Sequence, residues 1–361
     1  MRRVNYIFLL VAVLLSGCSK DVINPDNEQV VVPTKPYIYL DAGVSTRASL
    51  VEGTVLNQDF GVYGFTYDFN NTWSTYRVTA TPNVFDNVPQ KVTHQNGSYK
   101  YTPVKEWQGG KYTFFAYYPD DLDVSNEDVE GTPYVTYAPD FKYIANHRDV
   151  MTAMFEDTSL SSSPYVYFDF YHRLSAVDVV AMNFYEHSYD DPNSENTVIT
   201  EQVTIDIVDL KLQFENIQHK TAKIYLDRRI ESDCIPVDAG TNPEYQIISE
   251  KNGISINYNE DATLSPITAQ NNSSMIFIPQ ENTDLEVTTT VLYKKRRPNG
   301  EFLTNTEGKD VFTQIIETPF NQPLKECSRY YLQMTFTSSA VSISIITSNE
   351  WDDISVDYEF E

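Results

Sequence analysis

The stretch Lys111-Tyr112-Thr113-Phe114-Phe115-Ala116-Tyr117-Tyr118-Pro119 places aromatic side chains on both faces of a predicted strand. Such a strand is typical of the centre of a sheet that is covered on each side, as in a β-sandwich. The run Tyr99–Trp107 precedes it and Gly109-Gly110 separates the two runs, so we predict a hairpin. The rings could alternatively line a sugar-binding platform, but core packing is the interpretation that we adopt.

The composition of the whole chain agrees with a strand-rich fold. Its 361 residues include 26 Tyr and 19 Phe but only 13 Gly. Aromatic residues favour pleated, half-buried surfaces, and this glycine content excludes a fibrous or low-complexity chain. The length is sufficient for about two domains. We therefore predict an all-β protein with two domains.

Two segments show the strict alternation of a strand with one buried face. In the first, Pro36–Ala42, the side chains of Ile38, Leu40 and Ala42 share one face, and the strand is expected to end at Gly43. The second lies at the end of the chain, where polar residues alternate with Ile354, Val356, Tyr358 and Phe360. A strand that stays amphipathic to the last residue needs a pairing partner, in the same chain or in another.

The first residues have the pattern of a secretory leader. Met1-Arg2-Arg3 supplies positive charge, and Tyr6–Leu15 is an apolar run that is too short to span a bilayer. Leu15-Ser16-Gly17-Cys18 resembles the processing box of bacterial lipoproteins, in which the Cys after the cut carries lipid. We predict a signal peptide over 1–17 and lipid on Cys18; the alternative is a secreted protein that is cut elsewhere. No later apolar run has membrane-spanning length, so the predicted attachment to the outer membrane is this lipid.

Shifts in composition predict the domain boundaries. Residues 18–36 are polar and are expected to form a tether between the lipid and the first domain. Residues 187–198 carry few apolar side chains and include Asp190-Asp191-Pro192, which predicts a linker. We therefore expect an N-terminal β-sandwich domain over 37–186 and a C-terminal β-sandwich domain over 199–361.

The charge of the chain argues against nucleic acid as a partner. The formal net charge of −25 repels phosphate backbones. The four adjacent cations Lys294–Arg297 stand just before Asn299-Gly300, a turn signal. They predict a solvated hairpin tip rather than a binding patch.

The sequence offers little for catalysis. It contains no His-Glu-x-x-His, no Gly-x-Ser-x-Gly and no glycine-rich phosphate loop, and its five His are scattered. The acidic segment 120–130 does not match the spacing of an EF-hand. We therefore predict a protein that is not an enzyme and that uses no cofactor and no metal. A glycosidase with paired carboxylates stays an open alternative.

Beyond Cys18, the cysteines are Cys234 and Cys327. In an oxidising compartment they permit one disulfide. Two separate buried thiols are an equal alternative, because nothing in the sequence fixes the distance between them.

Several further motifs occur in an order that is typical of one family. They are Ser45-Thr46-Arg47-Ala48, Tyr101–Trp107, Phe114–Pro119, Phe170–Ser175, Arg329–Leu332 and Trp351. Together with the lipoprotein box, they make the chain resemble the fimbrillin family of Bacteroidales, which includes fimbrial subunits and lipoprotein adhesins. The resemblance covers nearly the whole mature chain and depends on the order and spacing of the motifs rather than on any single one.

The resemblance implies two tandem β-sandwich domains of transthyretin-like, Greek-key topology that assemble into a surface pilus. It further implies that an arginine-specific protease cuts between Arg47 and Ala48. The strand that carries Ile38, Leu40 and Ala42 would then leave, and a strand from the next subunit would fill its groove by β-strand addition.

Carried over to this sequence, the resemblance assigns the donated side chains to Ile354, Val356, Tyr358 and Phe360. The partners would be other pilus subunits, and the location would be the outer membrane and the fimbrium. Two alternatives stay open. Both strands could pair within their own chain, with Arg47 in an ordinary turn. The protein could also be a lipid-anchored adhesin that does not polymerise, at the tip or anchor of a pilus, and that binds host glycoprotein or polysaccharide.

Overall fold

The computed structural model describes residues 37–46, 49–56, 58–86, 88–125, 131–160, 165–238, 241–249, 251–259, 264–267 and 274–348, with only the backbone of 44–46 and 49–55. These residues are mainly strands, with the short helix α1 (Trp73–Tyr76) and the 3₁₀ turns η1 (Arg77–Thr79) and η2 (Ile144–Asn146). The predicted all-β class is confirmed. Within the described ranges, no helix has the length and apolar character needed to cross a membrane.

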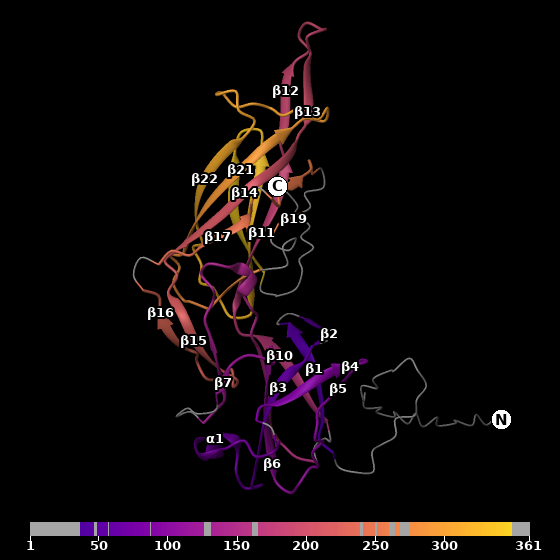
Figure 1. Ribbon diagram of the computed structural model, residues 1–361, viewed down its shortest axis with the longest axis vertical. Coiled ribbons are helices and arrows are strands. Elements are labelled where there is room, and N and C mark those ends of the chain that lie inside the picture. The colour runs from indigo at the N-terminus through magenta and orange to yellow at the C-terminus, as the bar shows by residue number, and fades with distance from the viewer. Residues whose placement is uncertain are drawn as a thin grey trace, which may run out of the picture. The chain divides into compact units, whose positions relative to one another are not determined.

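The first sheet has eight strands and folds over on itself. Its strands, in order across the sheet, are β2 (Ser49–Val55), β1 (Tyr39–Thr46), β10 (Tyr165–His172), β9 (Met151–Thr158), β6 (Lys111–Tyr118), β3 (Phe60–Tyr67), β4 (Gln90–Gln95) and β5 (Ser98–Lys100) (Figure 1). The ring of Phe60 in β3 lies 5.7 Å from that of Phe168 and 5.4 Å from that of Phe170, both in β10. Because β9 and β6 separate β3 from β10 in the sheet, these contacts require the sheet to curl around a shared interior. We call the apolar cluster around Phe60, Phe114 and Phe168 the first core.

The aromatic strand β6 is central, as predicted. It pairs with β3 on one side and β9 on the other, and its residues from Tyr112 to Tyr117 are buried. Phe114 faces the first core. Phe115 faces a separate cluster of aromatic rings, and the centre of its ring lies 5.1 Å from that of Trp73. Aromatic side chains on both faces are thus explained by burial on both faces.

The predicted hairpin around Gly109-Gly110 is wrong. In the run Tyr99–Trp107, the strand residues belong to β5, which pairs with β4 and not with β6. Pro103 has no N–H to donate to a ladder, which opposes a continuous strand here. Trp107 instead packs its ring edge-on against Tyr112, with centroids 4.8 Å apart.

The glycines of β3 allow side chains of neighbouring segments to approach its backbone closely. A Cβ added at Gly61 would lie 2.2 Å from the ring of Tyr117, and the Tyr117 side chain is only 1% exposed. We expect Gly61→Ala to lower the free energy of unfolding by roughly 1–2 kcal/mol, because the buried ring has no space into which to move. Urea denaturation followed by tryptophan fluorescence measures this loss. Gly109→Ala is the matched control, since an added Cβ there meets nothing within 4 Å; an equal loss in both variants would contradict the steric explanation.

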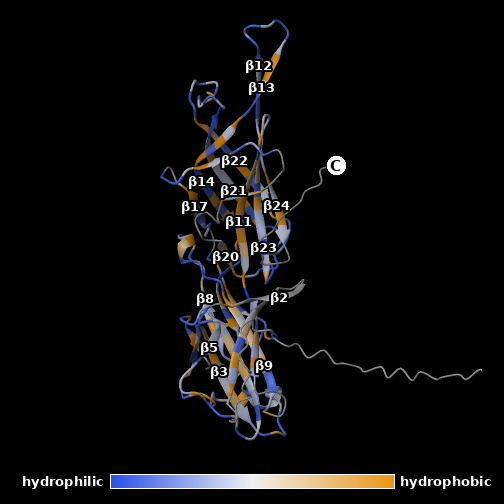
Figure 2. Cartoon of the chain, turned by 90° about the vertical axis from the view of Figure 1, so that its right-hand side faces the viewer, coloured by the Kyte–Doolittle hydropathy of each residue, from blue (hydrophilic) through white to orange (hydrophobic). Residues whose placement is uncertain are grey.

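Two sheets from the later part of the chain enclose a separate core. One contains β19 (Ser265–Pro266), β11 (Ser175–Phe184), β23 (Ser328–Thr337) and β24 (Val341–Ser348), with β20 (Met275–Phe277) also on β11. The other contains β17 (Glu244–Ile248), β14 (Thr204–Glu215), β21 (Glu286–Arg296) and β22 (Phe312–Pro319), with β18 (Ile254–Ile256) also on β14. Side chains of both sheets meet in the second core, the apolar cluster around Ile207, Phe214 and Leu332. Figure 2 shows hydrophobic, orange segments within these strands, as expected for a sandwich.

The expected linker 187–198 is a β-hairpin in the structure. β12 (Glu186–Asp190) pairs with β13 (Val198–Gln202) along its whole length. In addition, β11, expected in the N-terminal domain, pairs in parallel with β23 from the end of the chain. The linker prediction was wrong because a hairpin with both faces largely in solvent has the polar composition of a linker. The division into two domains and their transthyretin-like topology stay predictions.

A small sheet further joins early and late parts of the chain. It contains β16 (Asp233–Pro236), β15 (His219–Tyr225), β8 (Tyr134–Tyr137) and β7 (Val124–Ser125). β8 pairs with β15 through Ala222 opposite Tyr137 and Tyr225 opposite Tyr134. Its apolar side chains contribute to a third core, the cluster around Val135, Leu174 and Ile224, to which segments outside this sheet also contribute.

Candidate functional site

The strand β1 forms part of the wall of the first core. The side chains of Ile38, Leu40 and Ala42 are exposed by only 1%, 6% and 3%, and they belong to the same cluster as Phe168 and Phe170 of β10. The alternation predicted from the sequence is therefore present, although the strand continues past Gly43 to Thr46. Burial of an Ile or Leu side chain contributes about 1.5–3 kcal/mol. Together with Ile38 just before it, β1 is thus a stabilising part of the first core.

The backbone of β1 is held on both sides. It runs parallel to β10, from Tyr39 opposite Tyr165 to Val44 opposite Phe170, and antiparallel to β2. Just before it, the N–H of Ile38 donates to the carbonyl of Lys105 at 2.9 Å, and the hydroxyl of Tyr101 donates to the carbonyl of Ile38 at 2.8 Å. In the described sheet, β2 has β1 as its one neighbour. Loss of β1 would therefore open the edge of β10 and leave β2 without its described partner.

The predicted cleavage residues lie between two paired strands in the sequence. β1 ends at Thr46 and β2 begins at Ser49, whereas Arg47 and Ala48 lie outside the described residues. Cys18 and the predicted donor residues also lie outside them: Ile354, Val356, Tyr358 and Phe360. The roles of all these residues stay predictions.

Among the described strands of its sheet, the last one, β24, lies at the edge. It pairs with β23 from Val341 opposite Phe336 to Ser348 opposite Arg329. The alternating side chains of Val341, Ile343 and Ile345 are partly buried and pack against the second core. An edge strand of this kind offers main-chain groups to a further strand.

Cys234 and Cys327 do not form a disulfide, so that alternative is wrong for this structure. Cys234 lies on β16, packed against the third core, with its Sγ 3.7 Å from the carbonyl oxygen of Ser232. Cys327 precedes β23, where its N–H donates to the carbonyl of Leu174 at 3.1 Å. Burial, with a smaller effect of nearby carboxylates, raises the pKa of the Cys234 thiol. The thiolate that a nucleophilic cysteine requires is therefore disfavoured.

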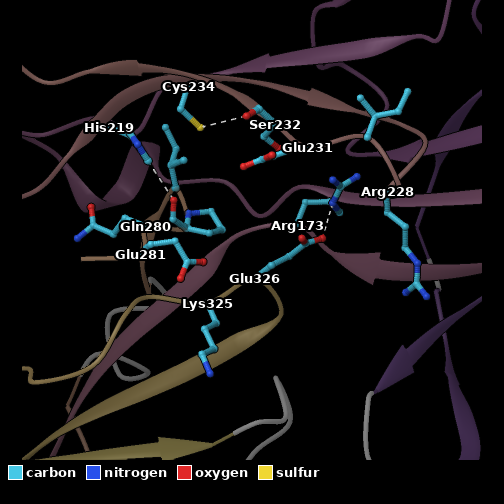
Figure 3. A pocket seen from close by; sticks show the side chains of 13 residues that line it. Arg173, His219, Arg228, Glu231, Ser232, Cys234, Gln280, Glu281, Lys325 and Glu326 are labelled. Carbon is cyan, nitrogen blue, oxygen red and sulfur yellow. Dashed lines mark hydrogen bonds and ion pairs between the residues drawn. The ribbon is translucent and has the colours of Figure 1, made fainter. Parts of the chain in front are cut away.

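A cavity of about 370 Å³ opens beside Cys234 (Figure 3). Arg173, a residue that is 4% exposed, lies at its wall. Its Nη1 donates to Oγ1 of Thr152 at 3.1 Å and to the carbonyl of Tyr225 at 2.5 Å, and its Nε forms an ion pair with Oε1 of Glu326 at 2.5 Å. These partners belong to β9, to β15 and to the segment before β23. The arrangement joins three parts of the fold and is structural in character.

The four cations Lys294–Arg297 are not a solvated loop tip. All but Arg297 belong to β21, and three of the four pair with carboxylates: Lys294 with Asp310 at 2.7 Å, Arg296 with Asp206 at 2.9 Å and Arg297 with Glu201 at 2.8 Å. The ammonium of Lys295 lies 4.0 Å from the centre of the Phe312 ring. The turn itself is where the sequence predicts it, with the N–H of Gly300 bonded to the carbonyl of Arg297. A cation that is paired with a carboxylate attracts a phosphate group less strongly than an unpaired cation does.

Buried His172 and partly buried His147 make structural contacts. Nδ1 of His172 lies 2.6 Å from Oδ2 of Asp149. His147 accepts a hydrogen bond from the N–H of Ile276 on Nδ1, and burial lowers its pKa. Across the described ranges, no three His, Cys, Asp or Glu side chains are grouped so as to hold a metal ion.

Comparison with known proteins identifies the family. The sequence model of the fimbrillin-like family matches residues 46–351, which is most of the chain. The chain belongs to the fimbrillin-like family. No curated protein matches this fimbrillin-like chain. The family resemblance predicted from the lipoprotein box and the motif order is confirmed.

This fimbrillin-like protein is also similar to solved structures. A fimbrial protein from Bacteroides vulgatus is 20% identical, with a TM-score of 0.60, over 88% of this chain and 99% of that one. A putative cell adhesion protein from Bacteroides uniformis is 17% identical, with a TM-score of 0.48, over 88% of this chain and 100% of that one. At these identities, the first likeness supports the shared fold.

The structure also shows a feature that the sequence reasoning did not single out. On β10, Tyr165 and Tyr167 point away from the first core and are 47% and 48% exposed, whereas Val166 and Phe168 between and after them are buried. The alternation of Tyr with Val and Phe was visible in the sequence. This alternation indicates a strand with one buried face and one aromatic face that points outward.

Proposed function

We propose that this fimbrillin-like protein is a structural, non-enzymatic subunit of a surface fimbria and that it contributes to cell adhesion. It is exported as a lipoprotein and reaches the outer membrane through lipid on Cys18. Cleavage between Arg47 and Ala48 then removes β1, and a strand of another subunit takes its place. Membership of the fimbrillin-like family supports this proposal. The match to the family model begins at Thr46, the residue before Arg47 of the proposed cleavage site.

The observation that carries the proposal is the position of β1. This strand is internal to its sheet and its inward side chains are buried, yet it ends one residue before Arg47. A single cut after Arg47 would therefore separate β1 from every residue that follows it in the chain. The vacated groove would expose the main-chain edge of β10 and the rings of Phe168 and Phe170. Such a groove has the two properties that β-strand addition requires, namely main-chain partners and apolar pockets for alternate side chains.

The proposed donor is the C-terminal segment with Ile354, Val356, Tyr358 and Phe360. Its alternation matches the period of Ile38, Leu40 and Ala42, so a strand of this kind would place one apolar face toward the first core. The larger side chains of the donor would bury more apolar area than the strand that they replace, which favours exchange. We also propose two tandem domains of transthyretin-like topology, the first of which accepts the strand.

Trimming with an arginine-specific protease tests the proposal. We expect trimmed protein to form ladders on gels run without heating and fibres in electron micrographs, whereas Arg47→Ala stays monomeric. Ile354→Asp should be cut normally but fail to assemble, because a carboxylate in an apolar pocket costs several kcal/mol.

Ser355→Asp is the matched control for the donor strand, since it places the same charge on the opposite face of the same segment. It should assemble like the wild type. The proposal fails if trimmed wild-type protein stays monomeric, or if Ile354→Asp assembles as well as Ser355→Asp does.

A second candidate function is a lipid-anchored adhesin that does not polymerise. The exposed tyrosine rings of β10 favour it, because aromatic groups that could be buried are instead presented to solvent. Untrimmed protein would then bind its ligand without any assembly.

A further inference from the structure

The outward face of β1 and β10 carries a group of tyrosine rings, Tyr39, Tyr165 and Tyr167, that we call the tyrosine shelf. Tyr165 and Tyr167 are 47% and 48% exposed and occupy positions i and i+2 on β10, so their Cα atoms lie about 6.6–7 Å apart. Tyr39 of β1 lies directly opposite Tyr165, with ring centroids 5.3 Å apart and planes inclined by 36°. Three neighbouring rings thus share one exposed surface.

The ring of Tyr167 lies along the sheet rather than standing out from it. A Cβ added at Gly43 of β1 would lie 2.1 Å from the hydroxyl oxygen of Tyr167. The hydroxyl end therefore occupies the space that any other residue at position 43 would fill. This glycine allows the ring to lie over the neighbouring strand, which leaves an open aromatic face toward solvent.

Two carboxylates flank the shelf. In the parallel register, Asp41 lies opposite Tyr167, and Asp169 lies opposite Gly43. The Asp169 carboxylate is oriented, because its Oδ2 accepts a hydrogen bond from the hydroxyl of Tyr171 at 3.0 Å. Asp41 is exposed, and its Oδ1 accepts a bond from the N–H of Ala42 at 2.9 Å. Both groups retain lone pairs that can accept hydrogen bonds from hydroxyls.

The shelf continues into a hollow of about 300 Å³, which Asp169 and Tyr171 also line. The guanidinium of Arg228 stacks over the Tyr171 ring at 4.1 Å. Arg229 pairs with Asp227 and with Glu156, both at 2.7 Å. The cations of the hollow are thus matched or outnumbered by carboxylates.

We propose that the tyrosine shelf binds a neutral oligosaccharide. Sugar rings present flat C–H faces that pack on exposed aromatic rings, and their hydroxyls are donors for Asp41 and Asp169. The spacing of Tyr165 and Tyr167 suits adjacent rings of an oligosaccharide. The hollow is a concave surface that could hold one end of that oligosaccharide. Sialylated, sulfated and uronic-acid glycans are disfavoured, because the flanking groups are carboxylates and the chain carries a formal charge of −25.

This inference rests on the second candidate function, the lipid-anchored adhesin that does not polymerise, and not on strand exchange. Tyr39 and Asp41 belong to β1, the strand whose removal is proposed, so the complete shelf belongs to the untrimmed chain. The test therefore uses untrimmed protein. It includes the Ile354→Asp variant, which separates sugar binding from assembly.

Binding of defined hexasaccharides to the untrimmed chain tests the proposal. The probes are cellohexaose, laminarihexaose, mannohexaose and xylohexaose, with hexagalacturonate as the acidic probe, measured by isothermal titration calorimetry. We expect at least one neutral probe to bind and hexagalacturonate to bind more weakly. Tyr167→Ala should raise the dissociation constant for the neutral probe by about tenfold, as expected for the loss of one stacking ring. Tyr167→Phe keeps the ring and should bind like the wild type.

Tyr143→Ala is the matched control, because Tyr143 is 53% exposed but lies on a different segment, at the start of η2. It should bind like the wild type, as should Ile354→Asp. The proposal is overturned if no neutral probe binds, if Tyr167→Ala and Tyr143→Ala bind equally well, or if hexagalacturonate binds best. It is also overturned if Tyr167→Ala impairs assembly of trimmed protein but leaves sugar binding unchanged, since the shelf would then be a contact between subunits.

Discussion

Leu40→Ala is expected to lower the free energy of unfolding by about 2–5 kcal/mol, the usual cost of truncating a buried leucine. The Leu40 side chain is 6% exposed and packs in the first core, which β1 shares with β3, β6 and β10. Because these strands are paired with their neighbours in the sheet, they cannot move far enough to fill the cavity that the lost atoms leave. Trp107 belongs to the same core, so its fluorescence during urea denaturation reports the change.

Asp41→Asn is the matched control on the same strand. Asp41 is exposed, and an Asn keeps an acceptor for the N–H of Ala42, so the stability should change by no more than about 0.5 kcal/mol. Equal losses in the two variants would contradict the role of the inward face. If β1 leaves during assembly, as proposed, trimmed Leu40→Ala should also assemble faster than trimmed wild type, because less apolar contact holds the departing strand.

The local character of the strands could be predicted from the sequence, but their partners could not. Alternation at Ile38, Leu40 and Ala42 is a property of adjacent residues, and it correctly identified the buried face of β1. The neighbour of that strand, β10, begins more than a hundred residues later in the chain, and no pattern in either strand specifies the other. The same limit explains the wrong hairpin, since a Gly-Gly pair indicates a turn but not which strands pair on either side of it.

The candidate site could be predicted only in part for a related reason. The buried face of β1 follows from its pattern, but the tyrosine shelf depends on which face of β10 is covered by other strands. Tyr165 and Phe168 are both aromatic, and only the curled sheet decides that one ring lies in solvent and the other in the core. Polar composition was similarly ambiguous at residues 187–198, where a linker and an exposed hairpin have the same signature.

Glu326→Ala is expected to lower the free energy of unfolding by about 2–3 kcal/mol, because it leaves the guanidinium of Arg173 buried without its carboxylate partner. The side chain of Arg173 is 2% exposed, whereas that of Glu326 is 40% exposed. The cost therefore arises mainly from the cation, which cannot recover its lost hydration. Burial lowers the pKa of Arg173, and the Glu326 carboxylate opposes that shift.

Two further variants separate this charge effect from packing. Glu281→Ala removes a carboxylate from the wall of the same cavity and should change the stability by no more than about 0.5 kcal/mol. Arg173→Lys keeps the charge but loses the planar fork, whose Nη1 serves both Thr152 and Tyr225, so it should also be destabilised. If Glu281→Ala costs as much as Glu326→Ala, the loss reflects the charge of the cavity as a whole. If Arg173→Lys is as stable as the wild type, then positive charge alone is sufficient at this position, and the fork that joins β9 to β15 contributes little.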